Sequence, residues 1–247
     1  MNATRRALLA ALEDGAVDGP TLADRLEVSR AAVWKQVEAL REEGFVIESG
    51  DGGYRVVDVP DYGAAALAFG LDAPYDVESH GRIPSTNDRA RELAEGGAAD
   101  VVVVADEQTG GRGRLDRTWA APSGGIWASL VLRPERPPAE IPMYTLAAAV
   151  AVARTAREAG VDAVIKWPND VLVERADRAD ARKLCGILTE MEGEADRVSW
   201  LVLGPGVNAN VDRDALPPGA TSLRAEVGDV DRRAFLQRML KEIHDLT

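Results

Sequence analysis

The sequence has 247 residues, of which 46% are hydrophobic and 28% charged, a composition that suits one or two domains with a substantial hydrophobic core. Its single cysteine, Cys185, excludes a disulfide framework and a multi-cysteine metal site, and its two histidines argue against a histidine zinc site or a Ser-His-Asp hydrolase. Without a long apolar stretch or a signal-peptide pattern, the chain is expected to be cytoplasmic and not to bind membranes.

The charge balance is strongly acidic. The formal net charge is −12, and only four of the 29 basic residues are lysines. Many acidic residues with few lysines are typical of a protein adapted to high salt, although an arginine-rich genome alone would also explain the scarcity of lysine. Because net negative charge opposes the approach of phosphates, the composition argues against non-specific nucleic-acid binding. Any DNA binding must therefore depend on a local surface.

The first sixty residues have the pattern of a winged helix-turn-helix domain. Residues 4–14 have helical apolar spacing, and a Gly-Pro-Thr turn leads into a second short helix. Ser29 is expected to cap a third helix that runs to about Glu43 and ends at Gly44. Residues 45–48 and 54–57, joined by a glycine-rich turn, are expected to form a hairpin. In such domains the third helix enters the major groove and the hairpin contacts the DNA backbone.

The DNA-binding surface is predicted from a local basic rim, because residues 1–60 carry seven basic and eleven acidic side chains. Arg41 contributes to this rim near the end of the third helix. The candidate DNA-binding residues are Ser29, Arg30, Trp34, Lys35 and Arg55. The alternative is a three-helix packing module without a role in DNA binding.

A change of composition and a proline near residue 60 predict two domains, 1–60 and 61–247. The elements expected in the second are a short alanine-rich helix after 63, a strand near 75–79, a helix capped at 85 and ending near 94, strands at 101–105 and 124–132, a helix over 144–160, strands at 163–166, 170–173, 184–191 and 198–203, and a closing helix over 231–246. The residues over 124–132 alternate enough in character to predict a strand there. Hairpin-like strand pairs between a few helices predict an α+β fold with a mainly antiparallel sheet.

The segment 106–119 carries the clearest chemical signal. Three glycines and three arginines fall between residues 110 and 119, against one acidic residue. Glycines allow the backbone to approach a ligand closely, and arginines offer planar charged groups that match phosphate. The alternative is a mobile surface loop with solvated arginines. The segment lacks the Gly-Lys-Ser/Thr ending of a Walker loop.

Two further segments retain lysines in an arginine-rich chain. Lys166 is expected to be a buried lysine at a strand end, followed by Trp167-Pro168-Asn169-Asp170, which could hold nucleotide phosphate and Mg²⁺. The alternative is a tight hairpin turn in which Pro168 and Asn169 only shape the backbone and bind no ligand. Lys183 follows Arg182 at the entrance to another strand. A lysine retained in an arginine-rich chain indicates a role that needs a compact ammonium group rather than a planar guanidinium.

Five motifs, in this order and spacing, resemble biotin protein ligases: Ser85-Thr86-Asn87, Gly111-Arg112-Gly113-Arg114 with Trp119, Lys166-Trp167-Pro168-Asn169-Asp170, Arg182-Lys183-Leu184-Cys185-Gly186-Ile187, and Gly204-Pro205-Gly206-Val207-Asn208. With the winged helix, the chain resembles the bifunctional type that is also the biotin-operon repressor. The resemblance covers nearly the whole chain. It implies a catalytic domain related to class II aminoacyl-tRNA synthetases and lipoate ligases, which agrees with the α+β prediction.

The resemblance implies a two-step reaction: biotin and ATP give biotinyl-5′-AMP, and a lysine of a biotin carboxyl carrier protein then takes the biotin. It also implies Mg²⁺, operator DNA and a homodimer when biotinyl-AMP is bound. The implied catalytic residues are Lys183, Arg114 and Arg112. The implied biotin-binding residues are Ser85, Thr86, Asn87, Gln108, Arg112, Gly113, Arg114, Trp119 and Lys183. The implied ATP or adenylate residues are Gly111, Arg117, Lys166, Trp167, Asn169, Asp170 and Asn208, with Asp170 as a metal ligand.

The sequence departs from the family pattern in two places. An Arg-Gly pair often follows the position of Arg114, and here Leu115-Asp116 stands there, so the loop could move differently. Many bacterial members continue into a small β-barrel-like domain, which we expect to be absent because Thr247 follows the last expected helix directly. Two alternatives remain: a biotin-sensing regulator with weak or lost ligase activity, and a lipoate-type ligase.

Overall fold

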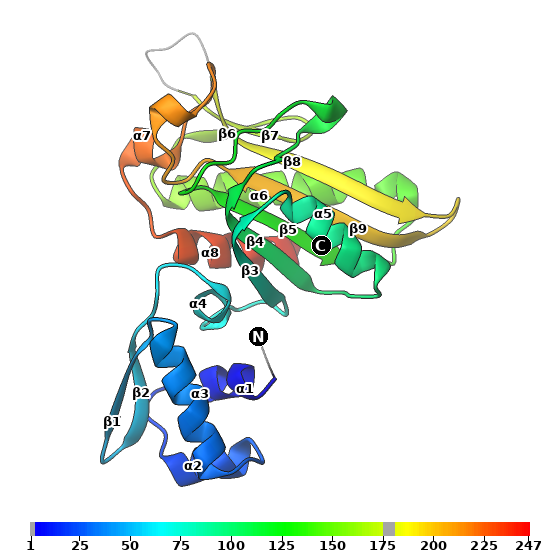
Figure 1. The fold of residues 1–247 in the computed structure, drawn as a ribbon. Helices are drawn as coiled ribbons and strands as arrows, with labels where there is room; N and C mark the ends of the chain where they lie inside the picture. Colours follow the sequence, from blue (N-terminus) through cyan, green and yellow to red (C-terminus); the bar gives the residue numbers. More distant parts are fainter. Residues whose placement is uncertain (1–2, 175–180) are drawn as a thin grey trace. The chain divides into compact units, whose positions relative to one another are not determined.

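The computed structural model describes residues 3–174 and 181–247, and the chain divides into two compact units, Met1–Asp72 and Ala73–Thr247 (Figure 1). Within the described residues, no helix combines the length and apolar character that crossing a membrane requires. The elements of the first unit are α1 (Ala3–Leu12), α2 (Gly19–Arg25), α3 (Arg30–Glu42), β1 (Val46–Gly50), β2 (Gly53–Asp58) and α4 (Ala64–Ala68).

Local signals position the helices of the first unit as the sequence predicts. The Asp18 carboxylate accepts a hydrogen bond from the Thr21 amide at 2.9 Å and begins α2. The Ser29 hydroxyl accepts one from the Ala32 amide at 3.2 Å and begins α3. After α3 the chain turns at Gly44, whose φ of +96° lies in the left-handed region that favours glycine.

The hairpin of β1 and β2 is antiparallel and is tied to the loop between α1 and α2 through two backbone hydrogen bonds between Val17 and Tyr54. A Cβ at Gly53 would lie 2.2 Å from the Val17 carbonyl oxygen, so this close approach requires glycine. Three helices and a two-stranded wing confirm the predicted winged helix-turn-helix order.

The first unit ends later than the sequence suggests. Ala65 and Ala66 of α4 are buried in the same apolar cluster as the leucines of α1 to α3. This packing places the division of the chain between Asp72 and Ala73, rather than at the predicted residue 60, where the composition changes. A sequence boundary drawn from a proline misses a helix that packs backward onto the preceding core.

The second unit has a seven-stranded sheet in the order β3-β4-β5-β9-β8-β7-β6. Its elements are β3 (Asp76–Ile83), α5 (Thr86–Glu95), β4 (Val101–Gln108), η1 (Arg114–Asp116), β5 (Ile126–Leu132), η2 (Pro138–Glu140), α6 (Pro142–Glu158), β6 (Ala163–Lys166), β7 (Asp170–Val173), β8 (Arg182–Gly193), β9 (Val198–Val207), η3 (Arg213–Ala215), α7 (Leu223–Val227) and α8 (Arg232–Leu246). β3 and β4 are parallel, and the other neighbouring strands are antiparallel, which confirms the predicted mainly antiparallel α+β fold.

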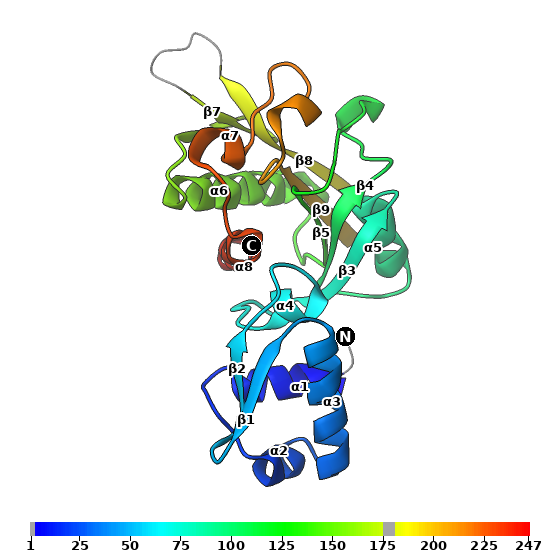
Figure 2. The ribbon, with the colours of Figure 1, turned by 60° about the vertical axis from the view of Figure 1, so that its left-hand side comes forward.

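The helices cover both faces of this sheet (Figure 2). α5 packs on β4, β5 and β9, whereas α6 packs on β6 to β9 and α8 packs against α6. As a consequence, all seven residues of β5, an interior strand of the sheet, are buried. The strand predicted over 124–132 is confirmed for Ile126–Leu132. A strand covered on both faces buries every side chain, so the alternation in its sequence does not appear as alternating exposure.

Candidate functional site

The N-terminal end of α5, the glycine-rich loop after β4 and the strands β8 and β9 enclose a cleft of about 520 Å³ that opens to solvent. It is lined by Ser85, Thr86, Asn87, Gln108, Arg112, Gly113, Arg114, Trp119, Trp127, Ala128, Asn169, Lys183, Gly186, Ile187, Leu188, Gly204, Pro205 and Gly206. All nine of the predicted biotin-binding residues are brought together here. Of the predicted nucleotide-binding residues, Asn169 joins them.

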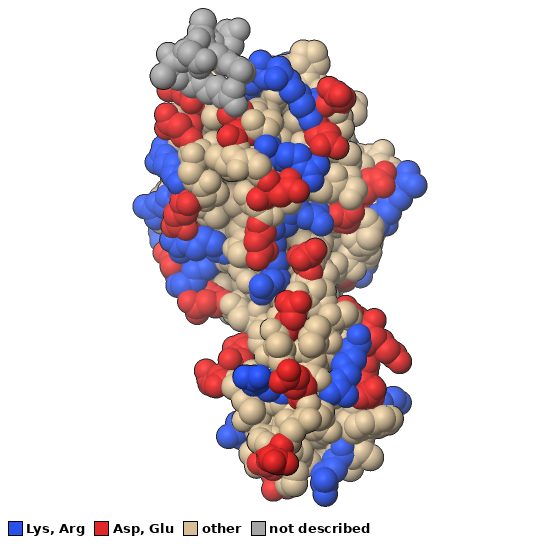
Figure 3. Space-filling view, turned by 90° about the vertical axis from the view of Figure 1, so that its left-hand side faces the viewer, with Lys and Arg blue, Asp and Glu red and all other residues tan. Residues whose placement is uncertain are grey.

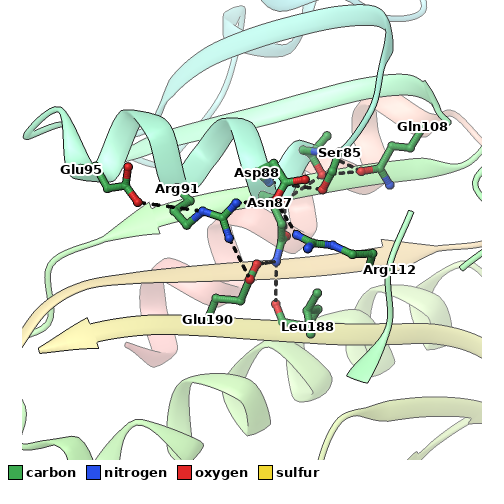
Figure 4. Close-up of polar contacts among 11 residues, drawn as sticks. Ser85, Asn87, Asp88, Arg91, Glu95, Gln108, Arg112, Leu188 and Glu190 are labelled. Carbon is green, nitrogen blue, oxygen red and sulfur yellow. Dashed lines mark hydrogen bonds and ion pairs between the residues drawn. The ribbon is translucent and has the colours of Figure 1, made fainter. Parts of the chain in front are cut away.

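One wall of the cleft is the start of α5 (Figure 4). The Ser85 hydroxyl accepts a hydrogen bond from the Asp88 amide at 3.2 Å and caps the helix. The backbone amide of Thr86 donates to Oε1 of Gln108 at 2.7 Å, and the Thr86 hydroxyl donates to the same oxygen at 3.0 Å. Gln108 therefore presents its carbonyl to the helix, and its amide nitrogen is left for other partners.

The glycine-rich loop forms the outer wall. A Cβ at Gly111 would lie 2.5 Å from the Trp119 carbonyl oxygen, so glycine allows the two ends of the loop to approach each other. Arg112 forms an ion pair with Asp88 of α5. The Arg114 guanidinium donates to Oδ1 of Asn169 at 2.9 Å, which joins the loop to the turn between β6 and β7. The loop thus brings two guanidinium groups to the cleft of a strongly acidic protein.

Lys183 stands at the inner end of the cleft. Its Nζ atom lies 2.7 Å from Oδ1 of Asp170 and 5.0 Å from the centroid of the Trp119 ring. A second cavity adjoins the first at Lys183 and Trp119, and it is lined mainly by apolar residues of the 216–220 segment together with Asn208. The Lys183 ammonium therefore lies between two cavities, where it can neutralise negative charge at their junction.

Asn208 is buried, and its side chain forms a hydrogen bond to the backbone of the described chain. Its Nδ2 group donates to the Thr221 carbonyl oxygen at 2.9 Å. Its Oδ1 atom is buried without a hydrogen-bond partner in the described part of the chain. A buried acceptor with no donor is costly, so this oxygen is suited to a ligand group that enters the second cavity.

Six of the seven predicted nucleotide-binding residues do not line the cleft. Asn208 lines the second cavity, and Asp170 pairs with Lys183. The other four line neither cavity. Lys166 is exposed, so the prediction of a buried lysine at this position is wrong: β6 is the edge strand of the sheet, and no further strand covers its end. Trp167 is 76% exposed and Arg117 is also exposed. Gly111 is buried at the base of the loop, where it allows the backbone to approach the Trp119 carbonyl group closely.

Sequence reasoning missed Ser129, Asp88 and Glu190, which support the cleft from behind. Ser129 is fully buried within β5, and its hydroxyl lies 2.8 Å from Thr86 Oγ1 and 2.6 Å from Asn87 Oδ1. Glu190 accepts a hydrogen bond from Asn87 Nδ2 at 2.7 Å. A serine in an apolar strand and two ordinary acidic residues give no distinctive pattern, so only the fold reveals them.

Nucleophilic and metal chemistry find little support from the described side chains. Cys185 is fully buried, and burial raises the pKa of its thiol well above the usual range, so the reactive thiolate is not available at neutral pH. Within residues 3–174 and 181–247, no group of three or more His, Cys, Asp or Glu side chains is placed to hold a metal ion. The carboxylate of Asp170, the predicted metal ligand, pairs with Lys183.

The predicted DNA-binding residues lie on the surface of the first unit. Ser29, Arg30 and Lys35 are exposed, and Trp34 is 56% exposed. Arg55 is exposed but forms an ion pair with Glu48 across the wing.

Arg41 does not contribute to the rim as predicted. Its guanidinium donates to the Ile47 carbonyl oxygen at 2.5 Å and pairs with Glu38. The cations that the first unit presents without an ion pair to a described residue therefore include Arg30 and Lys35, at the start of α3.

The family is decided by comparison with known proteins. Residues 80–208 match the Biotin/lipoate A/B protein ligase family. The chain belongs to this family. Residues 4–55 match a family described as an HTH domain, in agreement with the first unit of the structure. The first match includes the residues that line the cleft, and the second covers the winged helix-turn-helix of the first unit.

Two curated relatives of this ligase family extend the comparison across both units. The chain is 40% identical to the bifunctional ligase/repressor BirA of Bacillus subtilis, covering 91% of this chain and 71% of the relative. It is 30% identical to the protein of the same name from Escherichia coli, covering 96% and 74% respectively.

Solved structures of biotin protein ligases share the fold. One from Aquifex aeolicus, in complex with biotin and ATP, aligns with a TM-score of 0.57 at 29% identity and covers 69% of each chain. One from Leishmania major, in complex with biotinyl-5-AMP, aligns with a TM-score of 0.55 at 25% identity, covering 68% of this chain and 73% of the other.

Replacing Arg114 with glycine is expected to weaken retention of an acyl-adenylate by about 1.5–3 kcal/mol, because a charged hydrogen bond to phosphate is lost. The release rate of radiolabelled adenylate, measured by filter binding, checks this result. The matched control is Arg197→Gly at the exposed turn between β8 and β9, where Arg197 pairs with Glu194. Equal release rates in the two variants would remove Arg114 from the site.

Proposed function

We propose that the chain is an ATP-dependent biotin protein ligase that also represses transcription in response to biotin. The observation that carries this proposal is the position of Lys183 between two adjoining cavities, with Arg112 and Arg114 on the loop beside it. Family membership supports the ligase activity, and the relatives named for both ligase and repressor support the pairing of the two functions.

In the first step, a carboxylate oxygen of biotin attacks the α-phosphorus of ATP, and the bond to the bridging oxygen of pyrophosphate breaks. The head group would lie along Ser85, Thr86 and Gln108, and the carboxylate would point to Lys183. Two anions must meet in this step. The cation at the junction, with the guanidinium groups of the loop, offsets their repulsion and the charge that develops on the phosphate.

In the second step, the neutral ε-amine of an acceptor lysine attacks the carbonyl carbon of the mixed anhydride. AMP leaves with the electrons of the broken C–O bond, and the attacking nitrogen loses a proton to give the amide. Lys183 would again lie beside the phosphate that becomes the leaving group. Trp119, Trp127 and Ala128 would exclude water from the anhydride, which hydrolyses if exposed.

The second cavity suits the adenine and ribose of ATP. It is largely apolar, and Asn208 Oδ1 offers an acceptor there. Arg117, Lys166, Trp167 and Gly111 contribute to nucleotide binding only if the loops around them close on it. Mg²⁺ would enter with the ATP phosphates, which usually supply several of its ligands. Asp170 fits such a shared ion better than a metal site built from protein groups alone, since its carboxylate also pairs with Lys183.

The proposed acceptor is a lysine on a biotin carboxyl carrier protein. The proposed location of the chain is the cytoplasm, where it has access to both ATP and operator DNA. Transfer is tested by incubating the full chain with biotin, Mg²⁺-ATP and a carrier domain, followed by streptavidin detection and mass spectrometry. One biotin on one carrier lysine is expected. Adenylate formation without transfer would favour a biotin-sensing regulator, and transfer of lipoate would favour a lipoate-type ligase.

Repression would require a dimer, because a two-fold operator is read by two winged-helix domains, each of which presents its third helix to one half-site. We propose that biotinyl-AMP promotes this homodimer. Positive and negative side chains are interspersed over the face shown in Figure 3, so DNA would be held by a local surface rather than by a general field. Sedimentation with and without the adenylate tests the dimer.

Replacing Lys35 with glutamate is expected to weaken operator binding about tenfold or more and to lower the salt dependence, because one phosphate contact is lost and a repulsive charge is added. Biotin-dependent adenylation should remain at the wild-type rate. Electrophoretic mobility shifts at several salt concentrations measure the effect. Arg197→Glu makes the same change in net charge on the second unit and serves as the control. Parallel loss of DNA binding and adenylation would show that the first unit supports catalysis instead.

A further inference from the structure

The glycine-rich loop is attached to the second unit by its backbone at the base and by its side chains further out. At the base, the Gly110 amide donates to the Pro84 carbonyl oxygen at 2.8 Å. Further out, the Gly113 amide donates to the Arg117 carbonyl oxygen at 2.7 Å, a contact between two residues of the loop. Within the described chain, the backbone hydrogen bonds of residues 112–118 stay inside the loop. Side chains must therefore hold this outer part against the walls of the cleft.

Two arginines make these side-chain contacts, each with a different wall of the cleft. The Arg112 guanidinium pairs with Asp88, which lies in the first turn of α5. The Arg114 guanidinium donates to Oδ1 of Asn169, in the turn between β6 and β7. The loop therefore spans the cleft between α5 and this turn. Opening of the loop on the side of α5 has to break the pair between Arg112 and Asp88.

Asp88 also separates two positive charges. Its Oδ1 atom accepts a hydrogen bond from Arg91 Nη2 at 2.8 Å and another from Arg112 Nη2, so both guanidinium groups meet at one carboxylate oxygen (Figure 4). Without the negative charge, the loop would lose its ion pair, and two like charges would be left side by side. The side chains of Arg112 and Asp88 are 37% and 36% exposed, so solvent screening keeps this effect moderate.

The contact with Asp88 does not occupy all of Arg112. A guanidinium carries N–H donors on each of its nitrogens, and the contact with Asp88 is made through Nη2. The N–H groups on Nε and Nη1 are left for an anionic group in the cleft, which Arg112 lines and Asp88 does not. Asp88 can thus hold the loop from outside the cleft while Arg112 contacts a ligand inside it.

We infer that Asp88 is a positioning residue that keeps the glycine-rich loop closed over the acyl-adenylate, and that it acts through Arg112. This inference rests on the proposed function, because the adenylate is the intermediate that the cleft must retain between the two steps. Retention also matters for repression, since the proposed homodimer depends on bound biotinyl-AMP. One acidic residue outside the cleft would thus set how long the intermediate stays available for transfer and for DNA binding.

The first test is Asp88→Asn, which keeps the shape of the side chain and removes its charge. The full chain is loaded with synthetic radiolabelled biotinyl-AMP, and its release into an excess of unlabelled adenylate is followed by filter binding. Release is expected to be about three- to tenfold faster than from wild type, because an ion pair is lost and the charge of Arg91 is no longer offset.

The matched control is Glu92→Gln on the same helix. Glu92 pairs with Arg89 at 3.0 Å and is exposed, so the variant removes one acidic charge from α5 without touching the loop. Its release rate is expected to equal that of wild type. Thermal unfolding verifies that both variants are folded.

The decisive test is a double-mutant cycle with Arg112→Gln. This change alone is expected to speed release, because it removes both the pair with Asp88 and the contact of Arg112 with the ligand. Adding Asp88→Asn to Arg112→Gln should raise the release rate by less than about 1.5-fold, since the partner through which Asp88 acts is gone. If Asp88 only stabilised the start of α5, the two effects would instead multiply.

Unchanged release in Asp88→Asn, or effects that multiply in the cycle, would overturn the inference and leave the ligase function standing. Slower release in Asp88→Asn would also overturn it, because Asp88 would then compete with the ligand for Arg112. A wild-type chain that does not bind biotinyl-AMP would overturn the ligase function and this inference together.

Discussion

Replacement of Lys183 by alanine is expected to slow biotin-dependent adenylate formation about 100- to 1,000-fold, the effect typical of removing one group that stabilises developing charge. Its ammonium lies where the two cavities meet, 2.7 Å from Asp170. Without it, the biotin carboxylate and the α-phosphate would meet with no cation between them, and Asp170 would add to their repulsion. Initial rates of ATP–pyrophosphate exchange measure the loss.

Two controls make this result specific to Lys183. Lys241→Ala removes a lysine that pairs with Asp245 on the surface of α8, and it should leave the exchange rate unchanged. Operator binding by Lys183→Ala without ligand should match wild type, because the first unit is untouched. Wild-type exchange in Lys183→Ala would show that the charge at the junction comes from elsewhere.

The second large effect is expected for Gly204→Ala. A Cβ at this position would lie 2.0 Å from Asn87 Oδ1 and 2.9 Å from Asn87 Cγ. The end of the Asn87 side chain must then move, and it cannot stay in contact with Ser129. Biotin affinity is expected to fall about 100-fold, and overpacking should lower the free energy of unfolding by about 1–3 kcal/mol. Fluorescence titration and chemical denaturation give the two quantities.

The matched control for this change is Gly81→Ala on β3. A Cβ at Gly81 meets no atom within 4 Å, so the variant adds the same methyl group in open space. Its biotin affinity and stability should remain close to wild type. An equal loss in both variants would mean that the effect comes from the flexibility of glycine rather than from contact with Asn87.

Local signals predicted much of the fold, because they depend on residues near one another in the chain. Ser29, Ser85 and Asp231 each accept a hydrogen bond from the amide three residues on and begin the helices expected there. β6 and β7 have the predicted bounds, since Pro168 and Asn169 mark the turn between them.

Features that depend on distant neighbours were not predictable in the same way. The parallel pairing of β3 and β4, the complete burial of β5 and the exposure of Lys166 all follow from the strand order, which short-range patterns do not specify. The residues that support the cleft are of the same kind. Ser129 and Glu190 come from two strands and meet at Asn87, so neither has a local signal of its role.

The measurement that tests the central claim most directly is ATP–pyrophosphate exchange by the full chain with Mg²⁺, at low and at molar salt, with biotin or lipoate as the acid. The proposed ligase predicts exchange that requires biotin and does not occur with lipoate. No exchange with biotin at either salt concentration, or exchange with lipoate alone, would contradict it.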